Sequence, residues 1–247
     1  MKVRDLIKIP DFMELKKFLI FEPHPDDADI FMGGTIKWLT DKSKDVTLVT
    51  VTDGRKGTYD PSTTEEKLKL IRRKERERAG KVLGIKKILM LNYEDLNLPD
   101  TEKLTMDFLR IIREFKPDIV FTPDPWLPYE VHPDHIKTGI CVARASFLSP
   151  LPLILKETSP FNVKWISFYI TQNPNTYIDI TETFKEKLKA IETHKSQFPT
   201  EESINFIRNY LTLKHGEYGE RIKVKFAEAF KVLSPLHLHT NVDALNM

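Results

Sequence analysis

Cysteine is nearly absent from this chain of 247 residues, which contains only Cys141. A single thiol excludes internal disulfides, and it also excludes zinc or iron–sulfur sites built from several thiolates. Any metal ion that the chain holds must therefore take its ligands from histidine, aspartate or glutamate side chains.

Excess charge and long apolar runs are missing as well. The 38 Lys and Arg residues nearly balance the 36 Asp and Glu residues, so the net charge is only +2. This balance predicts a small-molecule partner and no nucleic acid. No stretch of the sequence reaches the roughly 20 uncharged apolar residues that a membrane span needs. We therefore expect no membrane association and a cytoplasmic protein.

The first half of the chain alternates between two kinds of segment. Short apolar and β-branched runs predict strands at residues 17–21, 46–51, 87–91 and 118–122. Helical patterns predict helices at residues 35–44, 62–83 and 102–115, the second opening after Ser62 and closing near Gly84. This alternation predicts an α/β fold with a Rossmann-like, mostly parallel sheet and helices on both faces. In such folds the site lies at the carboxyl ends of the strands.

The second half of the chain is less regular. Its patterns predict helices at residues 134–147, 182–195 and 201–213, and strands at residues 163–170 and 227–233. Neither a repeat nor a change of composition divides the sequence. We therefore expect a single α/β domain over residues 1–247.

The loop after the first predicted strand concentrates charge. It reads His24-Pro25-Asp26-Asp27-Ala28-Asp29, with one imidazole and three carboxylates in six positions. Three like charges this close repel one another unless a cation lies among them, and a divalent metal ion meets that need most simply. The alternative is a solvated acidic loop that caps the following helix.

A second cluster, His132-Pro133-Asp134-His135, follows the fourth predicted strand. At a helix start, two histidines three residues apart can face a common point. Together the two clusters place imidazoles and carboxylates at one edge of the predicted sheet. Nitrogen and oxygen ligands of this kind suit zinc.

These two clusters and the Gly33-Gly34 turn resemble the LmbE-like (PIG-L) family of zinc-dependent N-deacetylases, which remove acetyl groups from N-acetylglucosaminyl compounds. The resemblance extends from residue 17 to about residue 200. Further family-like segments are Arg72-Arg73-Lys74-Glu75, Tyr93-Glu94-Asp95 and His194-Lys195-Ser196-Gln197.

The resemblance implies a metal site and a catalytic acid and base. His24, Asp27 and His135 would hold one zinc ion per chain, with a position left for water and substrate. Asp26 would take a proton from that water and then protonate the leaving amine. His132 would support the tetrahedral intermediate, although a capping or supporting histidine is the alternative reading of the same residue.

Two further residues resemble substrate contacts of the family. Arg72 would hold sugar hydroxyl groups, and Asp95 would be an acidic contact. The helix that carries Arg72 is rich in both charges, so a solvated face is the alternative for this side chain. Trp126 and Tyr129 could stack on a sugar ring or simply pack in their proline-rich loop. We expect His194 to brace the fold rather than to bind metal.

The resemblance also implies a substrate and an assembly. The substrate would be a small N-acetylated amino sugar, favoured to be diacetylchitobiose or a short chitooligosaccharide from chitin degradation. Deacetylation at the non-reducing end would release acetate and a free amino sugar. A homo-oligomer is expected, hexameric by resemblance. Another N-acetylglucosaminyl conjugate is the alternative substrate.

Other classes of function fit less well. A non-catalytic Rossmann-like binder of sugars or nucleotides predicts a G-x-G-x-x-G loop, and carboxylates stand in its place. A two-metal phosphoesterase needs more ligands than the two clusters offer. Near the C-terminus, His237 and His239 are expected at the surface; whether this tail reaches a neighbouring subunit's site stays open.

Overall fold

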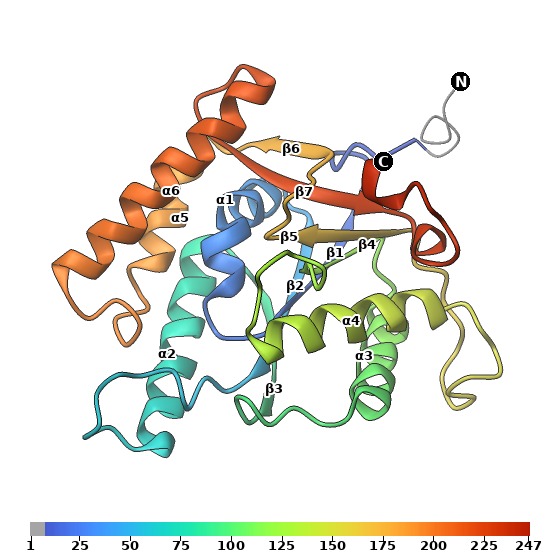
Figure 1. Cartoon of the computed structure of the whole chain (residues 1–247), viewed down its shortest axis with the longest axis horizontal. Helices are drawn as coiled ribbons and strands as arrows, with labels where there is room; N and C mark the ends of the chain where they lie inside the picture. Colours follow the sequence, from blue (N-terminus) through green and yellow to red (C-terminus); the bar gives the residue numbers. More distant parts are fainter. Residues whose placement is uncertain (1–7) are drawn as a thin grey trace. The chain divides into compact units, whose positions relative to one another are not determined.

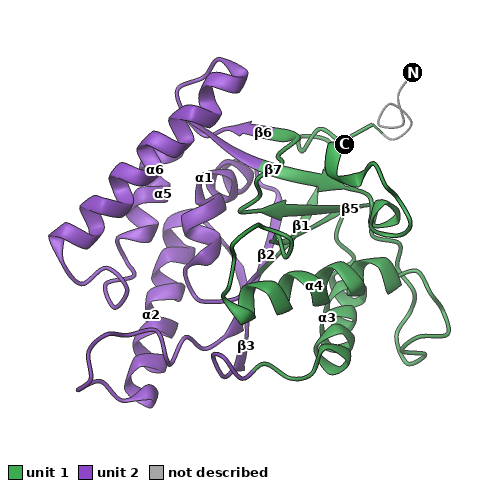
Figure 2. Ribbon diagram, in the orientation of Figure 1, with its two compact units in different colours: residues 1–21, 98–176, 230–247 green, residues 22–97, 177–229 purple. Residues whose placement is uncertain are grey.

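The computed structural model describes residues 8–247, and the chain forms two compact units, coloured separately in Figure 2. Unit 1 comprises Met1–Phe21, Leu98–Thr176 and Phe230–Met247, and unit 2 comprises Glu22–Asn97 and Tyr177–Ala229. Residues 1–7 lie outside the described part of the chain. The single domain over residues 1–247 stays a prediction.

Helices and strands alternate along most of the chain, as the labels in Figure 1 show. In order they are β1 (Lys17–Glu22), α1 (Asp27–Asp41), β2 (Asp45–Thr52), α2 (Glu65–Leu83), β3 (Lys87–Tyr93), α3 (Thr101–Phe115), β4 (Ile119–Pro123), α4 (Pro133–Leu148), β5 (Trp165–Tyr169), β6 (Thr176–Asp179), α5 (Phe184–Ile191), α6 (Glu201–Ile222) and β7 (Ala227–Leu233). Two short 3₁₀ helices follow, η2 (Pro235–Leu238) and η3 (Ala244–Asn246).

The seven strands are hydrogen-bonded in the order β3-β2-β1-β4-β5-β7-β6. The pairs β2/β3, β1/β4 and β4/β5 are parallel, and β5/β7 is antiparallel. This confirms the predicted α/β class with a mostly parallel sheet. Strand β6 was not predicted, because its four partly exposed residues form no apolar run.

Unit 1 is built around aromatic side chains. The ring of Phe121 on β4 packs against Phe12 and Phe230 in T-shaped contacts, with ring centroids 5.6 Å apart in both pairs. The Tyr169 hydroxyl donates a hydrogen bond to the carbonyl of Phe21, which fixes the end of β5 to the end of β1. Helix α3 packs on α4 and buries apolar side chains that include Leu104, Phe108 and Ile112.

In unit 2, helix α1 begins at Asp27, well before the predicted residue 35. The carboxylate of Glu22 accepts a hydrogen bond from the amide of Ala28, and acidic residues in a first turn complement the helix dipole. The predicted Gly33-Gly34 turn is wrong: both glycines lie inside α1, next to a kink at Met32.

These glycines allow close packing rather than a turn. A Cβ atom on Gly34 would lie 2.8 Å from side-chain atoms of Ile180, and one on Gly33 would lie 3.2 Å from Lys187 Cγ. The carboxylate of Glu228 on β7 accepts the amides of Gly34 and Thr35, which begin the second part of α1. The paired glycines therefore let α1 approach its neighbours in unit 2.

Three other helices differ from prediction at one boundary. Helix α5 ends at Ile191, four residues before the predicted end at residue 195. Helix α2 begins at Glu65, because the Thr64 hydroxyl, not Ser62, accepts the amide of Lys67. It ends as predicted at Gly84, whose φ of 75° suits glycine. Helix α6 continues to Ile222 past glycines that would favour an earlier end.

The C-terminal histidines do not share an environment. His237 lies in η2 and is buried, and its Nδ1 accepts the amide of Ser234, so the surface location expected for it is wrong. His239 is exposed, with its ring centroid 5.3 Å from that of Phe147. The mixed composition of the tail gave no signal of this burial.

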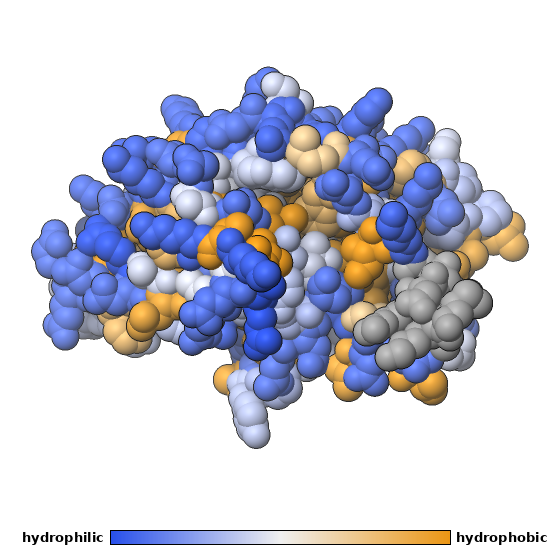
Figure 3. All heavy atoms as spheres, turned by 90° about the horizontal axis from the view of Figure 1, so that it is seen from above, coloured by the Kyte–Doolittle hydropathy of each residue, from blue (hydrophilic) through white to orange (hydrophobic). Residues whose placement is uncertain are grey.

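The surface is polar in the view of Figure 3, where hydrophilic side chains predominate and apolar ones form small groups among them. Among residues 8–247, none of the helices combines the length and apolar character that crossing a membrane would require.

Candidate active site

The first cluster lies at the carboxyl end of β1 and the start of α1. The amide of His24 donates to Asp27 Oδ2 at 2.8 Å, and the Nδ1 atom of His24 lies 3.2 Å from the same oxygen. Asp26 is the N-cap residue of α1, and all three side chains are buried. The local fold therefore brings an imidazole and a carboxylate together in unit 2.

Two groups of possible metal ligands share His24. Ligand atoms of His24, Asp27 and His135 lie within 4.8 Å of one another, and so do those of His24, His132 and Asp134. The first group is the predicted ligand set, which the structure thus brings together. Two imidazoles and one carboxylate make three protein ligands, the number that zinc takes in catalytic sites, where water is the fourth ligand.

In unit 1, Glu130 organises both predicted histidines. Its Oε1 accepts the amide of His132 at 2.8 Å, and its Oε2 lies 3.2 Å from His135 Nδ1. A carboxylate on one ring nitrogen orients the ring so that the other nitrogen can bind a metal ion. Glu130 was not predicted from the sequence, because no spacing rule marks a supporting carboxylate in a loop.

His132 is the N-cap residue of α4, and its Nδ1 accepts the amide of Asp134 at 3.3 Å. A neutral imidazole that accepts at Nδ1 carries its proton on Nε2. The ring therefore offers an N–H donor, as support of an oxyanion requires. Its role in catalysis stays a prediction.

Asp26, the predicted catalytic carboxylate, forms an ion pair with Arg72. Arg72 Nη2 lies 3.1 Å from Asp26 Oδ1, and both side chains are buried. The Nη1 atom of Arg72 donates to the carbonyl of Gly54, where φ is 70° and a Cβ would come within 2.7 Å of Arg72. Arg72 thus lies inside the molecule beside Asp26 and not on a solvated helix face.

Asp95 holds the loop that packs on Arg72. Its two carboxylate oxygens accept the amides of Gly54 and Lys56, at 2.9 and 3.1 Å. The side chain is 3% exposed. Contact of Asp95 with substrate stays a prediction; in this structure it anchors the loop after β2.

A buried charge network, which no sequence pattern indicated, lies beneath the first turn of α1. Arg76 donates to Asp29 Oδ1 at 2.8 Å and to Glu22 Oε2 at 3.3 Å, and all three side chains are fully buried. Burial raises the pKa of Glu22 to about 8. Burial also acts to raise the pKa of Asp29, but Arg76 and His194 outweigh it and hold that pKa below its usual value.

His194 completes this network, with Nε2 2.7 Å from Asp29 Oδ2. Two residues further on, the amide and hydroxyl of Ser196 both donate to Glu75 of α2. The bracing role expected for His194 is thus confirmed. It ties the segment after α5 to the helix that carries Asp27.

A mostly parallel α/β sheet with histidine and aspartate ligands at a strand end is typical of metal-dependent hydrolases. Residues 19–146 match the PIG-L family, described as GlcNAc-PI de-N-acetylase. The chain belongs to this family.

Individual relatives support the same assignment. The chain is 38% identical over 233 residues to diacetylchitobiose deacetylase of Thermococcus kodakarensis, covering 92% of this chain and 87% of the relative. It is 34% identical to a probable N-acetyl-alpha-D-glucosaminyl L-malate deacetylase 2 of Bacillus anthracis, covering 74% and 81%. Its structure matches N,N'-diacetylchitobiose deacetylase from Pyrococcus horikoshii with a TM-score of 0.89 and 42% identity, covering 94% and 88%.

Proposed function

We propose that this protein hydrolyses the acetamide of an N-acetylglucosamine unit and releases acetate and a free amine. The substrate is diacetylchitobiose or a short chitooligosaccharide, deacetylated at its non-reducing end. The observation that carries the proposal is the convergence of His24, Asp27 and His135, whose ligand atoms lie within 4.8 Å of one another. Relatives named as deacetylases of N-acetylglucosaminyl compounds support the choice of substrate.

One zinc ion per chain would be held by His24, Asp27 and His135. When bound, zinc lowers the pKa of a ligand water to near 7 and polarises a carbonyl group. Glu130 would keep the His135 ring in its ligating orientation through the contact at Nδ1. A nitrogen and oxygen ligand set with an open position is the chemistry that amide hydrolysis needs.

The protein's own residues would then move the proton. Asp26 accepts the proton of the attacking water and passes it to the leaving amine. Arg72, whose Nη2 lies 3.1 Å from Asp26 Oδ1, orients that carboxylate. The Nε2–H of His132 donates to the oxygen of the tetrahedral intermediate, where charge develops.

The remaining parts of the proposal concern the cell and the assembly. A cytoplasmic homo-oligomer, hexameric by family resemblance, acts on a small sugar and on neither nucleic acid nor membrane lipid. The net charge of +2 supports the absence of a polyanionic partner.

The test is release of free amine from diacetylchitobiose and from N-acetylglucosamine, with zinc and after chelation. We expect zinc-dependent release that falls at least about 100-fold in Asp26→Asn. Asp41→Asn, an exposed carboxylate on the same helix, is the matched control and should stay active. Release that persists after chelation, or in Asp26→Asn, contradicts the proposed chemistry.

Metal content separates this mechanism from that of a two-metal phosphoesterase. We expect about one zinc per chain, lost in His24→Ala, whereas a phosphoesterase of that kind would hold two. If neither sugar releases amine but N-acetylglucosaminyl malate does, the substrate assignment changes while the chemistry stands.

A further inference from the structure

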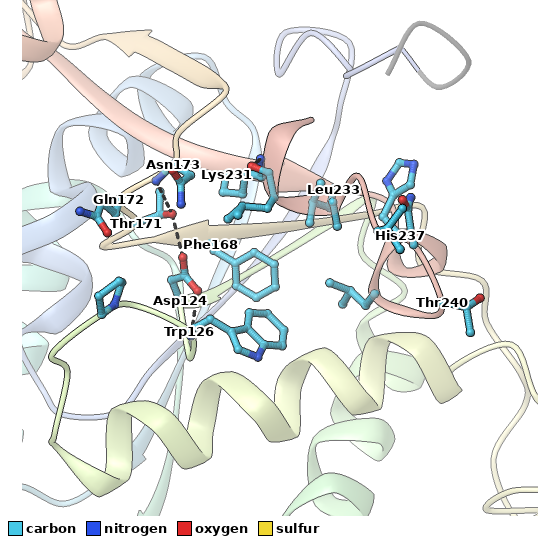
Figure 4. Close-up of a pocket in the computed structure, with 16 residues that line it drawn as sticks. Asp124, Trp126, Phe168, Thr171, Gln172, Asn173, Lys231, Leu233, His237 and Thr240 are labelled. Atoms are coloured by element: carbon cyan, nitrogen blue, oxygen red, sulfur yellow. Dashed lines mark hydrogen bonds between the residues drawn. The ribbon is translucent and has the colours of Figure 1, made fainter. Parts of the chain in front are cut away.

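A cavity of about 700 Å³ lies within unit 1, and Figure 4 shows the side chains that line it. Three of its lining residues, Asp124, Trp126 and Pro128, come from the loop that follows β4 and ends at His132. The volume falls in the range typical of small-molecule sites. None of the chemistry proposed above uses this space.

One wall of the cavity is aromatic. The rings of Trp126 and Phe168 lie together in Figure 4, in a T-shaped contact with centroids 5.5 Å apart. Trp126 is nevertheless 56% exposed. Apolar side chains of the C-terminal segment, including Leu238, Val242 and Leu245, also line the cavity. A flat ligand with apolar faces could therefore stack on the indole.

A second wall is polar, and hydrogen bonds connect several of its groups. Asp124 Oδ2 accepts the hydroxyl of Thr171 at 2.7 Å, and its Oδ1 accepts the amide of Trp126 at 3.0 Å. The Thr171 hydroxyl oxygen also accepts the amide of Asn173. The exposed side-chain amides of Gln172 and Asn173 complete this wall. Both hydrogen-bond donors and acceptors thus border the space.

The charges restrict the kind of ligand. The carboxylate of Asp124 would repel an anion, and the Lys231 ammonium already donates to the carbonyl of Leu245 at 2.9 Å. A wholly apolar ligand would remove water from Asp124 without replacing its hydrogen bonds, which costs free energy. A neutral molecule with apolar faces and a rim of hydroxyl groups satisfies both walls.

We propose that this cavity binds an N-acetylhexosamine unit of an oligosaccharide, with one sugar face on Trp126 and its hydroxyl or amide groups on Asp124 and Asn173. The sugar's identity rests on the proposed function; the cavity and its chemistry do not. Because none of the residues that line the cavity is a proposed metal ligand or catalytic residue, the bound unit is one other than the unit being deacetylated. Substrates longer than one sugar should gain affinity from it.

The test compares sugars of different length on zinc-loaded protein. Tetra-N-acetylchitotetraose and N-acetylglucosamine are titrated calorimetrically into Asp26→Asn protein, which should turn them over at least about 100-fold more slowly. We expect Trp126→Ala to weaken binding of the tetrasaccharide about tenfold and to leave the monosaccharide within twofold. Trp126→Phe, which keeps a ring, should restore most of the loss. Phe206→Ala, an exposed aromatic on α6, is the matched control.

A second variant tests the cavity in case Trp126→Ala fails to fold. Asn173→Ala alters an exposed side chain, so it should fold normally and still weaken the tetrasaccharide a few-fold. Equal tetrasaccharide affinities in the parent, Trp126→Ala and Asn173→Ala would overturn the inference.

Activity measurements distinguish this inference from the proposed function. On an otherwise unaltered protein, Trp126→Ala should raise KM for the tetrasaccharide about tenfold and leave kcat unchanged. If no sugar is deacetylated but tetrasaccharide binding still depends on Trp126, the cavity stands and the proposed function falls. If deacetylation proceeds with the same KM in Trp126→Ala, the cavity assignment falls alone.

Discussion

Asp29 and His194 are 165 residues apart in the sequence, yet their side chains meet at 2.7 Å and are fully buried. The other carboxylate oxygen of Asp29 lies 2.8 Å from Arg76. Asp29 sits one turn or less from Asp26 and Asp27 on α1. This contact therefore fixes the helix turn on which the proposed base and metal ligand depend.

Asp29→Asn should destabilise the protein strongly, because it leaves the buried Arg76 short of a charge partner. Breaking a buried pair by removing one member costs about 3–5 kcal/mol. Denaturant unfolding measures the loss. Glu77→Gln, which removes an exposed partner of Arg73, is the control and should cost less than about 1 kcal/mol. Equally small losses of unfolding free energy in the two variants would show that the buried charge network contributes little to stability.

Sequence patterns predicted the elements that are defined by local periodicity. The strands β1, β2, β3 and β4 and the helices α3 and α4 fall within a few residues of their expected bounds. The ligands of the proposed metal site were also accessible, because His24 and Asp27 lie in one short segment and His135 in another. Which aspartate binds metal came only from resemblance.

Contacts between segments that are distant in the sequence could not be predicted from sequence patterns. No property of residue 29 alone indicates that its partner is His194, and the role of Gly34 depends on Ile180 on another segment. Arg72 illustrates the same limit: its helix is rich in charge, but the fold turns this side chain inward onto Asp26, as it turns Arg76 onto Asp29. Tertiary packing decided each of these cases.

Glu130→Gln should weaken zinc binding, because glutamine keeps the acceptor for the His132 amide but loses the charge beside His135 Nδ1. Removing a carboxylate that orients a ligand histidine typically costs about 10- to 100-fold in metal affinity or activity. Competition with a chromogenic chelator measures the affinity. The exposed Glu114→Gln on α3 is the control. Unchanged affinity in Glu130→Gln would mean that Glu130 does not support the ligand.

Gly34→Ala should destabilise the protein by about 1–3 kcal/mol, because the added methyl group would lie 2.8 Å from Ile180 in a packed interior. Gly216→Ala is the matched helical control. Apart from the adjoining residues and backbone of α6, no atom of residues 8–247 lies within 4 Å of its added Cβ, so alanine should stabilise α6 by up to about 1 kcal/mol. Thermal unfolding of both variants gives the comparison, and opposite signs are expected. Stabilisation by Gly34→Ala would contradict the close packing of α1.

His215 predicts how stability depends on pH. Burial and the nearby charge of Lys187 hold its pKa well below 6.5, while its Nδ1–H donates to the carbonyl of Ala227 and its buried Nε2 has no hydrogen-bond partner among residues 8–247. The folded protein thus keeps this ring neutral, whereas the unfolded chain gains a proton as the pH falls through about 6.5. Stability from this residue is fully present above that pH and declines below it.

The contribution of His215 can be measured as the slope of unfolding free energy against pH. In His215→Gln the part of the decline that comes from His215 should disappear. Between pH 6.5 and 5.5 the wild type should therefore lose about 1 kcal/mol more unfolding free energy than the variant. Denaturant unfolding at several pH values gives both slopes, and His239→Gln, which alters an exposed ring, should keep the wild-type slope. Because the difference between slopes cancels the titration of every other group, parallel slopes in wild type and His215→Gln would show that His215 titrates alike in the folded and unfolded protein.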